Sequence, residues 1–385
     1  MRILHCCLAA FYNEGYGYQE NILPRMHKKQ GHIVRILAST EKFIDKMNLG
    51  YVDACTFENE DGIMVTRLPY VSIFPHKLAT KIRLYKGLKR ELSNFAPDVI
   101  FLHDAQFLSI ITVVNYLKKH KNIRVFVDGH TDFGNSATSY VSKYILHGVV
   151  YKWCIGKILP FVEKFYGTLP SRVDFFVNFY KTPKDKTELL VLGADDDRIE
   201  EVKKSNMRDV IRDKFNIGIK TLLIVTGGKF DERKTSILDL MAAVKKVSQV
   251  YDVKLLIFGS VMDGDFKTRF SSLCDNDIVH YAGWVSSAET YAYFEAGDLI
   301  VFTGSHSVLW EQAAGQGKPC IFNRYMGQTH IDVGGNCLFL EDVSEDGIYR
   351  IIFNAISEYE QLKFNAEAKG TSYFSYDNIA ARAIR

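Results

Sequence analysis

The ten residues TLLIVTGGKF (221–230) decide the fold that we expect for this chain. An apolar run over 221–225 ends at Thr226 and the pair Gly227-Gly228. A short apolar run that stops at glycines predicts a buried strand entering a loop. A helix-period segment follows over about 237–249, and a second apolar run over 253–258. This order of strand, helix and strand is typical of a parallel sheet covered by helices.

The same alternation extends along the whole chain in both directions. We expect strands at 2–8, 33–38, 64–68, 99–102, 124–127, 174–177, 188–192, 221–225, 253–258, 277–281, 298–302 and 319–322. We expect helices at 18–30, 77–95, 140–166, 237–249, 288–296, 310–315 and 348–362.

The length of 385 residues exceeds what one core usually holds, so we expect two α/β domains. We predict an N-terminal Rossmann-like domain over 1–186 and a second one over 187–370, facing each other across a cleft. Residues 371–385 are expected to form a terminal helix that returns toward the first domain. Ligands of such sheets bind at the carboxyl ends of the strands.

Composition and charge exclude several classes of protein. The chain is 47% hydrophobic and 24% charged, and no window is apolar enough for a membrane span. Its seven cysteines have no metal-binding spacing, which favours reduced thiols and a cytoplasmic location. Residues 1–185 carry a net charge of +9 and the remainder −6. The acidic half argues against nucleic-acid binding, while the basic half suits an anionic partner.

Two glycine loops are candidate phosphate sites. Gly15 and Gly17 stand between the first expected strand and helix, where the backbone can approach a ligand and a helix start favours an anion. Gly228 is followed by Lys229 and Lys234, two cations that could stabilise a leaving diphosphate. A simple loop in the first case and a solvated turn in the second remain about as plausible from spacing alone.

A third loop leads into a helix that carries Glu311 in an apolar setting. A carboxylate accepts hydrogen bonds from a ribose diol, so we expect Glu311 to line the cleft. The alternative is a serine helix cap with Glu311 on a solvated face. The loop residues that we expect to contact a donor are Gly304, Ser305, His306, Ser307 and Val308.

These motifs, taken in order, resemble the retaining GT-B glycosyltransferases of glycosyltransferase family 4. The stretch EQAAGQGKP (311–319) is similar to the second half of the family's Glu-x7-Glu motif with its Gly-x-Pro. Gly228-Lys229 and Lys234 resemble the family's donor-diphosphate contacts. Further matches are Gly193–Asp195 at the start of the second domain, Gly283, Trp284 and Val285 where the donor base is held, and Phe374–Tyr376 before the terminal helix.

The resemblance implies sugar transfer from a nucleotide-diphosphate sugar, with UDP the expected carrier, to a saccharide or lipid-linked saccharide acceptor. It implies that His130 lies near the transfer centre and that Glu311 is catalytic. The first Glu of the motif is replaced by Thr303, which leaves retention or inversion open. No Asp-x-Asp stands where a metal clamp would need it, so neither a metal nor another cofactor is expected.

Two alternatives remain open at this stage: a UDP-N-acetylglucosamine-type epimerase, and an inactive sugar-nucleotide-binding relative. Basic, aromatic-rich segments over 74–92 and 140–166 also predict peripheral binding to an anionic membrane face, as expected for an enzyme of polysaccharide or glycolipid synthesis. Two ordinary surface helices would be the other explanation of those segments.

Overall fold

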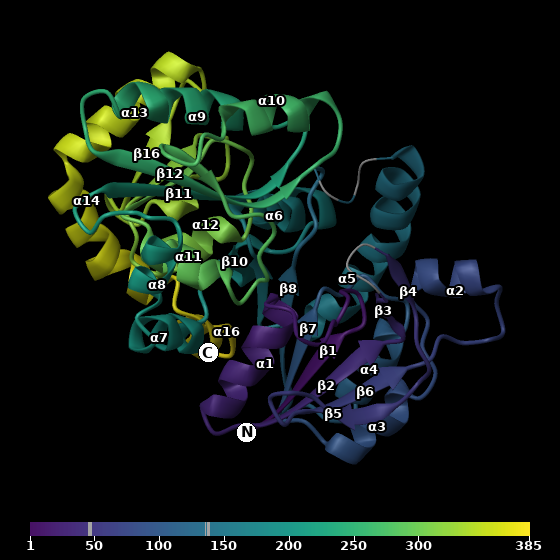
Figure 1. Cartoon of the computed structure of the whole chain (residues 1–385). Helices are drawn as coiled ribbons and strands as arrows, with labels where there is room; N and C mark the ends of the chain where they lie inside the picture. Colours follow the sequence, from purple (N-terminus) through teal and green to yellow (C-terminus); the bar gives the residue numbers. More distant parts are fainter. Residues whose placement is uncertain (45–47, 135, 137–138) are drawn as a thin grey trace. The chain divides into compact units, whose positions relative to one another are not determined.

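The computed structural model describes residues 1–44, 48–134, 136 and 139–385, which form two compact units (Figure 1). Unit 1 comprises Met1–Val191 with Ala380–Arg385, and unit 2 comprises Leu192–Ile379. The division lies after Val191 and not after residue 186, because the Leu190 N–H still donates to the Gly167 carbonyl of unit 1 at 3.0 Å.

Unit 1 is built on an eight-stranded sheet in the order β10-β9-β8-β7-β1-β2-β6-β5. All neighbouring strands run parallel except β5 and β6. Side chains alternate along β1, so Leu4 and Cys6 enter the main core while His5 faces α1 on the other side. The strands are β1 (Arg2–Cys7), β2 (Ile33–Ser39), β5 (Thr56–Glu58), β6 (Met64–Leu68), β7 (Val99–His103), β8 (Arg124–Gly129), β9 (Lys164–Gly167) and β10 (Thr187–Leu189), with a separate hairpin of β3 (Glu41–Phe43) and β4 (Leu49–Tyr51).

Helices cover both faces of this sheet. The main core joins the sheet to α3, α4 and α5, which contribute Leu92, Val113 and Ile155. The helical segments are α1 (Gln19–Lys29), α2 (His76–Ile82), α3 (Leu88–Phe95), α4 (Ile110–Leu117), the π-helical η1 (Val141–Tyr151), α5 (Lys152–Ile158), η2 (Leu159–Phe161), α6 (Pro170–Asp174), η3 (Phe175–Tyr180) and η4 (Lys184–Lys186).

Unit 2 is a six-stranded parallel sheet in the order β13-β12-β11-β14-β15-β16. Figure 1 shows α9, α10 and α13 over one face and α8, α11 and α12 over the other. The strands are β11 (Leu222–Phe230), β12 (Val253–Val261), β13 (Val279–Tyr281), β14 (Leu299–Phe302), β15 (Cys320–Asn323) and β16 (Cys337–Leu340). The helical segments are α7 (Asp196–Lys204), α8 (Met207–Lys214), α9 (Ser236–Val247), α10 (Asp265–Leu273), α11 (Thr290–Ala296), α12 (Leu309–Gly315), η5 (Thr329–Ile331), α13 (Glu345–Ser357), α14 (Tyr359–Asn365), η6 (Ala366–Gly370), α15 (Thr371–Tyr373) and α16 (Tyr376–Ala383).

Four local expectations were wrong. The helix expected over 77–95 is broken, because Arg83 takes a φ of 54° and separates α2 from α3. The helix expected over 140–166 ends at Phe161, and its last residues enter β9. The strand expected over 174–177 is helical, because Pro170 starts α6 and the short apolar run after it is ambiguous between the two periods. The loop expected at Gly227-Gly228 is a continuation of β11, paired with β12.

Within the described residues, no helix has both the length and the apolar character that crossing a bilayer requires.

Candidate functional site

The carboxyl ends of three neighbouring strands of unit 2 meet through glycines. Gly228 of β11 pairs with Gly259 of β12, and a Cβ on Gly259 would overlap the Gly228 carbonyl. The Gly259 N–H donates to the carbonyl of Gly283, which follows β13, at 2.8 Å. Side chains at Gly228 and Gly283 would meet nothing within 4 Å, so open space lies beside both. The backbone of this edge is therefore bare, as an approaching ligand would need.

Two of the predicted cations stand at the same edge. Lys229 is exposed and Lys234 half-buried, and neither is in an ion pair with a described residue. The Lys234 side chain lies 3.8 Å from the position that a Cβ on Gly304 would occupy. The Ser236 hydroxyl, at the start of α9, donates to the Thr303 carbonyl at 3.2 Å. The structure therefore brings the second and third predicted loops together in unit 2.

Glu311, on the first turn of α12, is held by two histidines. His306 Nε2 donates to Glu311 Oε1 at 2.7 Å, and His330 Nε2 donates to the same oxygen at 3.0 Å. Glu311 is 0% exposed, so the alternative that places it on a solvated face does not hold. Its second oxygen, Oε2, accepts no hydrogen bond from the described residues. His330 was missed at the sequence level because it lies 19 positions away with no motif around it.

The electrostatics keep this carboxylate ionised. Burial alone would raise the Glu311 pKa, but His306 and His330 outweigh it and lower the pKa to about 2. The three side chains also have the donor types of a metal cluster. As placed, both imidazoles already donate to one carboxylate oxygen, which accounts for the arrangement as a hydrogen-bonded clamp.

The other predicted donor contacts of unit 2 lie on its loops. Trp284 is 57% exposed on the loop after β13, and Val285 follows it half-buried. Ser305 is exposed, whereas the Ser307 hydroxyl accepts the Leu309 N–H at 3.2 Å, at the first residue of α12. Val308 is the half-buried residue that precedes that helix.

Thr303, in the place of the motif's first Glu, is buried. Its hydroxyl bonds Ser236 Oγ at 3.0 Å, and its carbonyl accepts Asn323 Nδ2 at 2.9 Å. The residue therefore ties β14 to α9 and β15.

In unit 1, the Gly15–Gly17 loop does not present a bare phosphate cradle. The Gly15 N–H, at a φ of 74°, donates to Glu60 Oε1 at 2.8 Å. Glu14 beside it pairs with Lys42 at 2.7 Å and with Arg67 at 2.8 Å. Gly17 is half-buried in the same loop. An anion at this loop would have to displace or neutralise these carboxylates.

His130 follows β8 and faces two carboxylates. Its Nε2 lies 3.6 Å from Asp128 Oδ2 and 3.9 Å from Glu20 Oε1, and its side chain is 27% exposed. Burial lowers the His130 pKa, but Asp128 and Glu20 together raise it above the usual value. A histidine whose charged form is favoured can donate a hydrogen bond or a proton to an oxygen.

Asp104 is a functional candidate that the sequence analysis missed. It follows β7 with a φ of 63°, unusual for a residue with a side chain, and is 5% exposed. Its N–H donates to Asp128 Oδ1 at 3.3 Å, and its Oδ2 accepts the Thr131 hydroxyl at 3.3 Å. Burial raises the Asp104 pKa to about 6, although Arg83 acts against this rise. Strained backbone and a perturbed carboxyl are features of functional sites.

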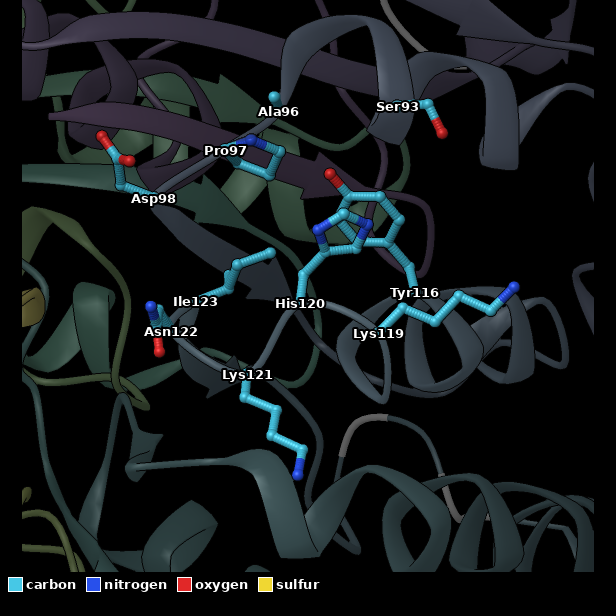
Figure 2. A pocket seen from close by; sticks show the side chains of 10 residues that line it. All are labelled: Ser93, Ala96, Pro97, Asp98, Tyr116, Lys119, His120, Lys121, Asn122 and Ile123. Carbon is cyan, nitrogen blue, oxygen red and sulfur yellow. The ribbon is translucent and has the colours of Figure 1, made fainter.

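Two open hollows in the described part of the chain lie away from these groups. One of about 660 Å³ is lined by Asp98, His120 and Ile123, at the amino ends of β7 and β8 (Figure 2). There the His120 ring stacks on Tyr116 with centroids 4.2 Å apart. Another, of about 570 Å³, is lined by Asp298 and Pro319 at the amino ends of β14 and β15. The first hollow is at the opposite end of the unit 1 strands from His130, and the second is at the opposite end of the unit 2 strands from Lys229. Ligands of parallel sheets seldom bind at the amino ends of the strands.

Comparison with known proteins gives a distant curated relative and a consistent fold. No protein-family model matches the chain. The chain is 24% identical over 312 residues to alpha-monoglucosyldiacylglycerol synthase of Streptococcus pneumoniae (strain ATCC BAA-255 / R6). The match covers 76% of this chain and 64% of that relative, so the chain spans less than two thirds of its length.

Solved structures share the fold over almost the full length. A glycosyltransferase from Rickettsia africae ESF-5 superposes with a TM-score of 0.66 at 13% identity, covering 99% of this chain and 96% of that one. A UDP-GlcNAc 2-epimerase from Neisseria meningitidis, bound to UDP-GlcNAc, gives a TM-score of 0.63 at 12% identity, covering 99% and 98%. The chain thus has the two-domain fold of Rossmann-like parallel sheets found in glycosyltransferases of GT-B type, as predicted.

Proposed function

We propose that this protein is a glycosyltransferase that moves a sugar from a nucleotide-diphosphate sugar to a lipid or lipid-linked saccharide acceptor. The observation that carries the proposal is the edge of unit 2 where Lys229 and Lys234 stand beside the bare backbone of Gly228 and Gly304. Two cations without ion-pair partners among the described residues suit a diphosphate that gains charge as the sugar leaves. The name of the pneumococcal relative supports a glucosyl lipid product.

The remaining roles divide between the units. We assign the donor base to the loop of Gly283, Trp284 and Val285, and the diphosphate to the two lysines. Glu311 holds His306, the more exposed of its two histidine partners, against the donor. The Oε2 atom of Glu311 accepts no hydrogen bond from the described residues and can accept one from a donor hydroxyl. In unit 1, His130 contacts the reacting sugar. The two lysines supply the positive charge that a metal would otherwise provide, so we propose a metal-independent reaction.

An exposed surface of unit 1 supports a membrane-bound acceptor. We call it the apolar-basic face: Ile73, Phe74 and Leu78 at α2, and Tyr140, Val141, Tyr144, Ile145, Val149 and Trp153 on η1 and α5, with Lys77, Lys81, Lys143, Lys152 and Lys157. The Tyr151 hydroxyl donates to the Lys81 carbonyl at 2.7 Å, which joins the two parts. Ile73 is 82% and Tyr140 74% exposed, so this apolar surface is not used in the core of unit 1.

We propose that the apolar-basic face binds an anionic membrane surface peripherally. Aromatic and aliphatic side chains enter the interface while lysines contact lipid headgroups, a division typical of interfacial helices. Apolar residues farther along, such as Tyr85, Leu88 and Leu92, instead turn into the core. Only part of the segment 74–92 therefore contributes to this face.

A transfer assay tests the function. Purified protein is incubated with radiolabelled UDP-glucose, UDP-galactose or UDP-GlcNAc, together with vesicles that contain diacylglycerol or monoglucosyldiacylglycerol. We expect label in the lipid phase from one donor, undiminished by EDTA. Epimerised donor without labelled lipid would instead identify an epimerase like the Neisseria structure, and donor binding without any product would identify an inactive relative.

The stereochemical course is part of the proposal. We propose retention, although Thr303 replaces the carboxylate of the motif. NMR of the first-formed glycolipid determines it, since an α-linked product from an α-linked donor shows retention.

A further inference from the structure

Three histidines of unit 1 form one buried hydrogen-bonded chain. His27 Nε2 lies 2.9 Å from the Ala380 carbonyl oxygen, and His27 Nδ1 lies 3.0 Å from His5 Nε2. His5 Nδ1 lies 3.0 Å from His103 Nε2, and His103 Nδ1 lies 3.0 Å from Asp128 Oδ2. All three histidines and Asp128 are 0% exposed. The chain crosses from α1 through β1 and β7 to the end of β8.

Counting protons shows that, with Asp128 ionised, one of these three histidines carries a positive charge. Its two ends, a backbone carbonyl and a carboxylate, can only accept hydrogen bonds. The four contacts therefore need four N–H groups, whereas three neutral imidazoles carry three in total. One proton beyond neutrality is required for every contact to be a hydrogen bond, whichever tautomers are chosen.

The surroundings place that proton at the His103 end. Burial, His27 and His103 lower the His5 pKa, and burial lowers the His27 pKa to about 4 although the Ala380 carbonyl opposes this. Burial would raise the Asp128 pKa, but His103 and His130 hold it well below its usual range. Asp128 is therefore a carboxylate, and the imidazole within hydrogen-bonding distance of it is that of His103, at 3.0 Å.

The other titratable groups around the chain do not supply this proton. His32 lies beside His27, with ring centroids 6.1 Å apart. Burial raises the pKa of the Cys6 thiol on β1 to about 12, which keeps that thiol neutral. Glu20 on α1 and Asp104 after β7 face the Asp128 and His130 end and add negative charge there. That negative charge favours a positive charge at the Asp128 end of the hydrogen-bonded chain.

We propose that His27, His5 and His103 are positioning residues that hold one excess proton next to Asp128 and so keep Asp128 ionised and directed at His130. At the far end, the Ala380 carbonyl belongs to the last turn of α16, where carbonyls without helical partners carry partial negative charge. The role for His130 rests on the proposed transferase function, whereas the proton count does not.

Nitrogen-15 NMR of the full, ligand-free chain labelled at histidine tests the proton count directly. At pH 7.5 we expect His103 with both ring nitrogens protonated, and His5 and His27 each protonated at Nε2 alone. Single variants His5→Gln, His27→Gln and His103→Gln assign the signals. Three neutral histidines in the wild-type spectrum would overturn the proposal, even if a variant failed to fold.

The pH profile of kcat tests the positioning role. His103→Gln removes the cation, so the Asp128 pKa rises and the acidic limb of the profile moves up by about one to three pH units, with KM for the donor unchanged. The matched control is His280→Gln, a buried histidine of unit 2 that is outside the chain. An unshifted limb in His103→Gln overturns the positioning role. If the excess proton is found but the protein transfers no sugar, the proposed transferase function is wrong and the protonated histidine chain is still supported.

Discussion

His306 Nε2 lies 2.7 Å from Glu311 Oε1, and this bond fixes the loop after β14 to the first turn of α12. His330 adds a second bond to the same oxygen from the segment after β15. A single buried carboxylate thus orders two loops at the edge of unit 2 where Lys234 lies along Gly304. Its removal should change both the stability of unit 2 and the binding of a donor.

Replacing Glu311 by Gln should lower the free energy of unfolding by about 1–3 kcal/mol, because His306 and His330 both lose the charged acceptor that they share. The Glu311 pKa is lowered from 4.5 to about 2, so its stabilisation is complete above pH 4.5 and is lost as the pH falls toward 2. Denaturant unfolding at pH 7 and pH 3 should show a smaller acid loss in Glu311→Gln than in wild type. Glu341→Gln, at an exposed ion pair of the same unit, is the control. Equal acid losses in Glu311→Gln and wild type would contradict the clamp.

Replacing Lys229 or Lys234 by Ala should weaken binding of the nucleotide-diphosphate donor. Loss of one charge-assisted phosphate contact costs about 1.5–3 kcal/mol, a roughly tenfold to hundredfold rise in Kd. Isothermal titration with UDP measures it. Lys267→Ala, an exposed lysine on α10 paired with Asp263, should bind like wild type. Wild-type affinity for UDP in both loop variants would show that the diphosphate does not bind at Lys229 and Lys234.

The apolar-basic face should bind anionic vesicles in a salt-dependent manner. The protein is expected to co-sediment with phosphatidylglycerol vesicles at low salt and to be released at high salt, because screening shortens the reach of its lysines. The variant Tyr144→Ser with Trp153→Ser, and separately Lys77→Glu with Lys81→Glu, should stay in the supernatant. Lys203→Glu with Lys204→Glu on α7 provides the charge-matched control. If the wild-type protein stays in the supernatant at low salt, the proposal that the apolar-basic face binds a membrane is wrong.

Arg212 should be the most sensitive cation of unit 2 for stability. It is 2% exposed, pairs with Asp298 at 3.2 Å and donates to the Ala296 and Thr221 carbonyls at 3.0 and 2.6 Å. Arg212→Ala should cost about 3–5 kcal/mol, since it removes one of the two cations that pair with Asp298 and takes a buried donor from the Ala296 and Thr221 carbonyls. Arg208 lies on the same helix and pairs with the same Asp298, but its side chain is 33% exposed. Arg208→Ala should therefore lower the free energy of unfolding far less. Similar melting temperatures for the two variants would contradict this ranking.

The local sequence was enough to predict many of the strands, because strands that are buried in a parallel sheet consist of short apolar runs. The expected strand over 64–68 is β6, and the apolar runs at 2–8, 33–38 and 253–258 are the cores of β1, β2 and β12. The strand assigned to 174–177 failed because an aromatic run of that length fits either period. The helix expected over 77–95 failed because nothing in the residue type of Arg83 shows a left-handed backbone.

The sequence by itself determined the α/β class, the two domains and the loops that follow the strands, because apolar periodicity and glycine position are local properties of the chain. Only the tertiary structure decided which side chains meet. His330 reaches Glu311, Asp104 reaches Asp128, and His27, His5 and His103 line up, from segments whose separation in sequence carries no signal. The protonation of these groups followed in turn, since burial and neighbouring charges exist only once the sheet has brought the segments together.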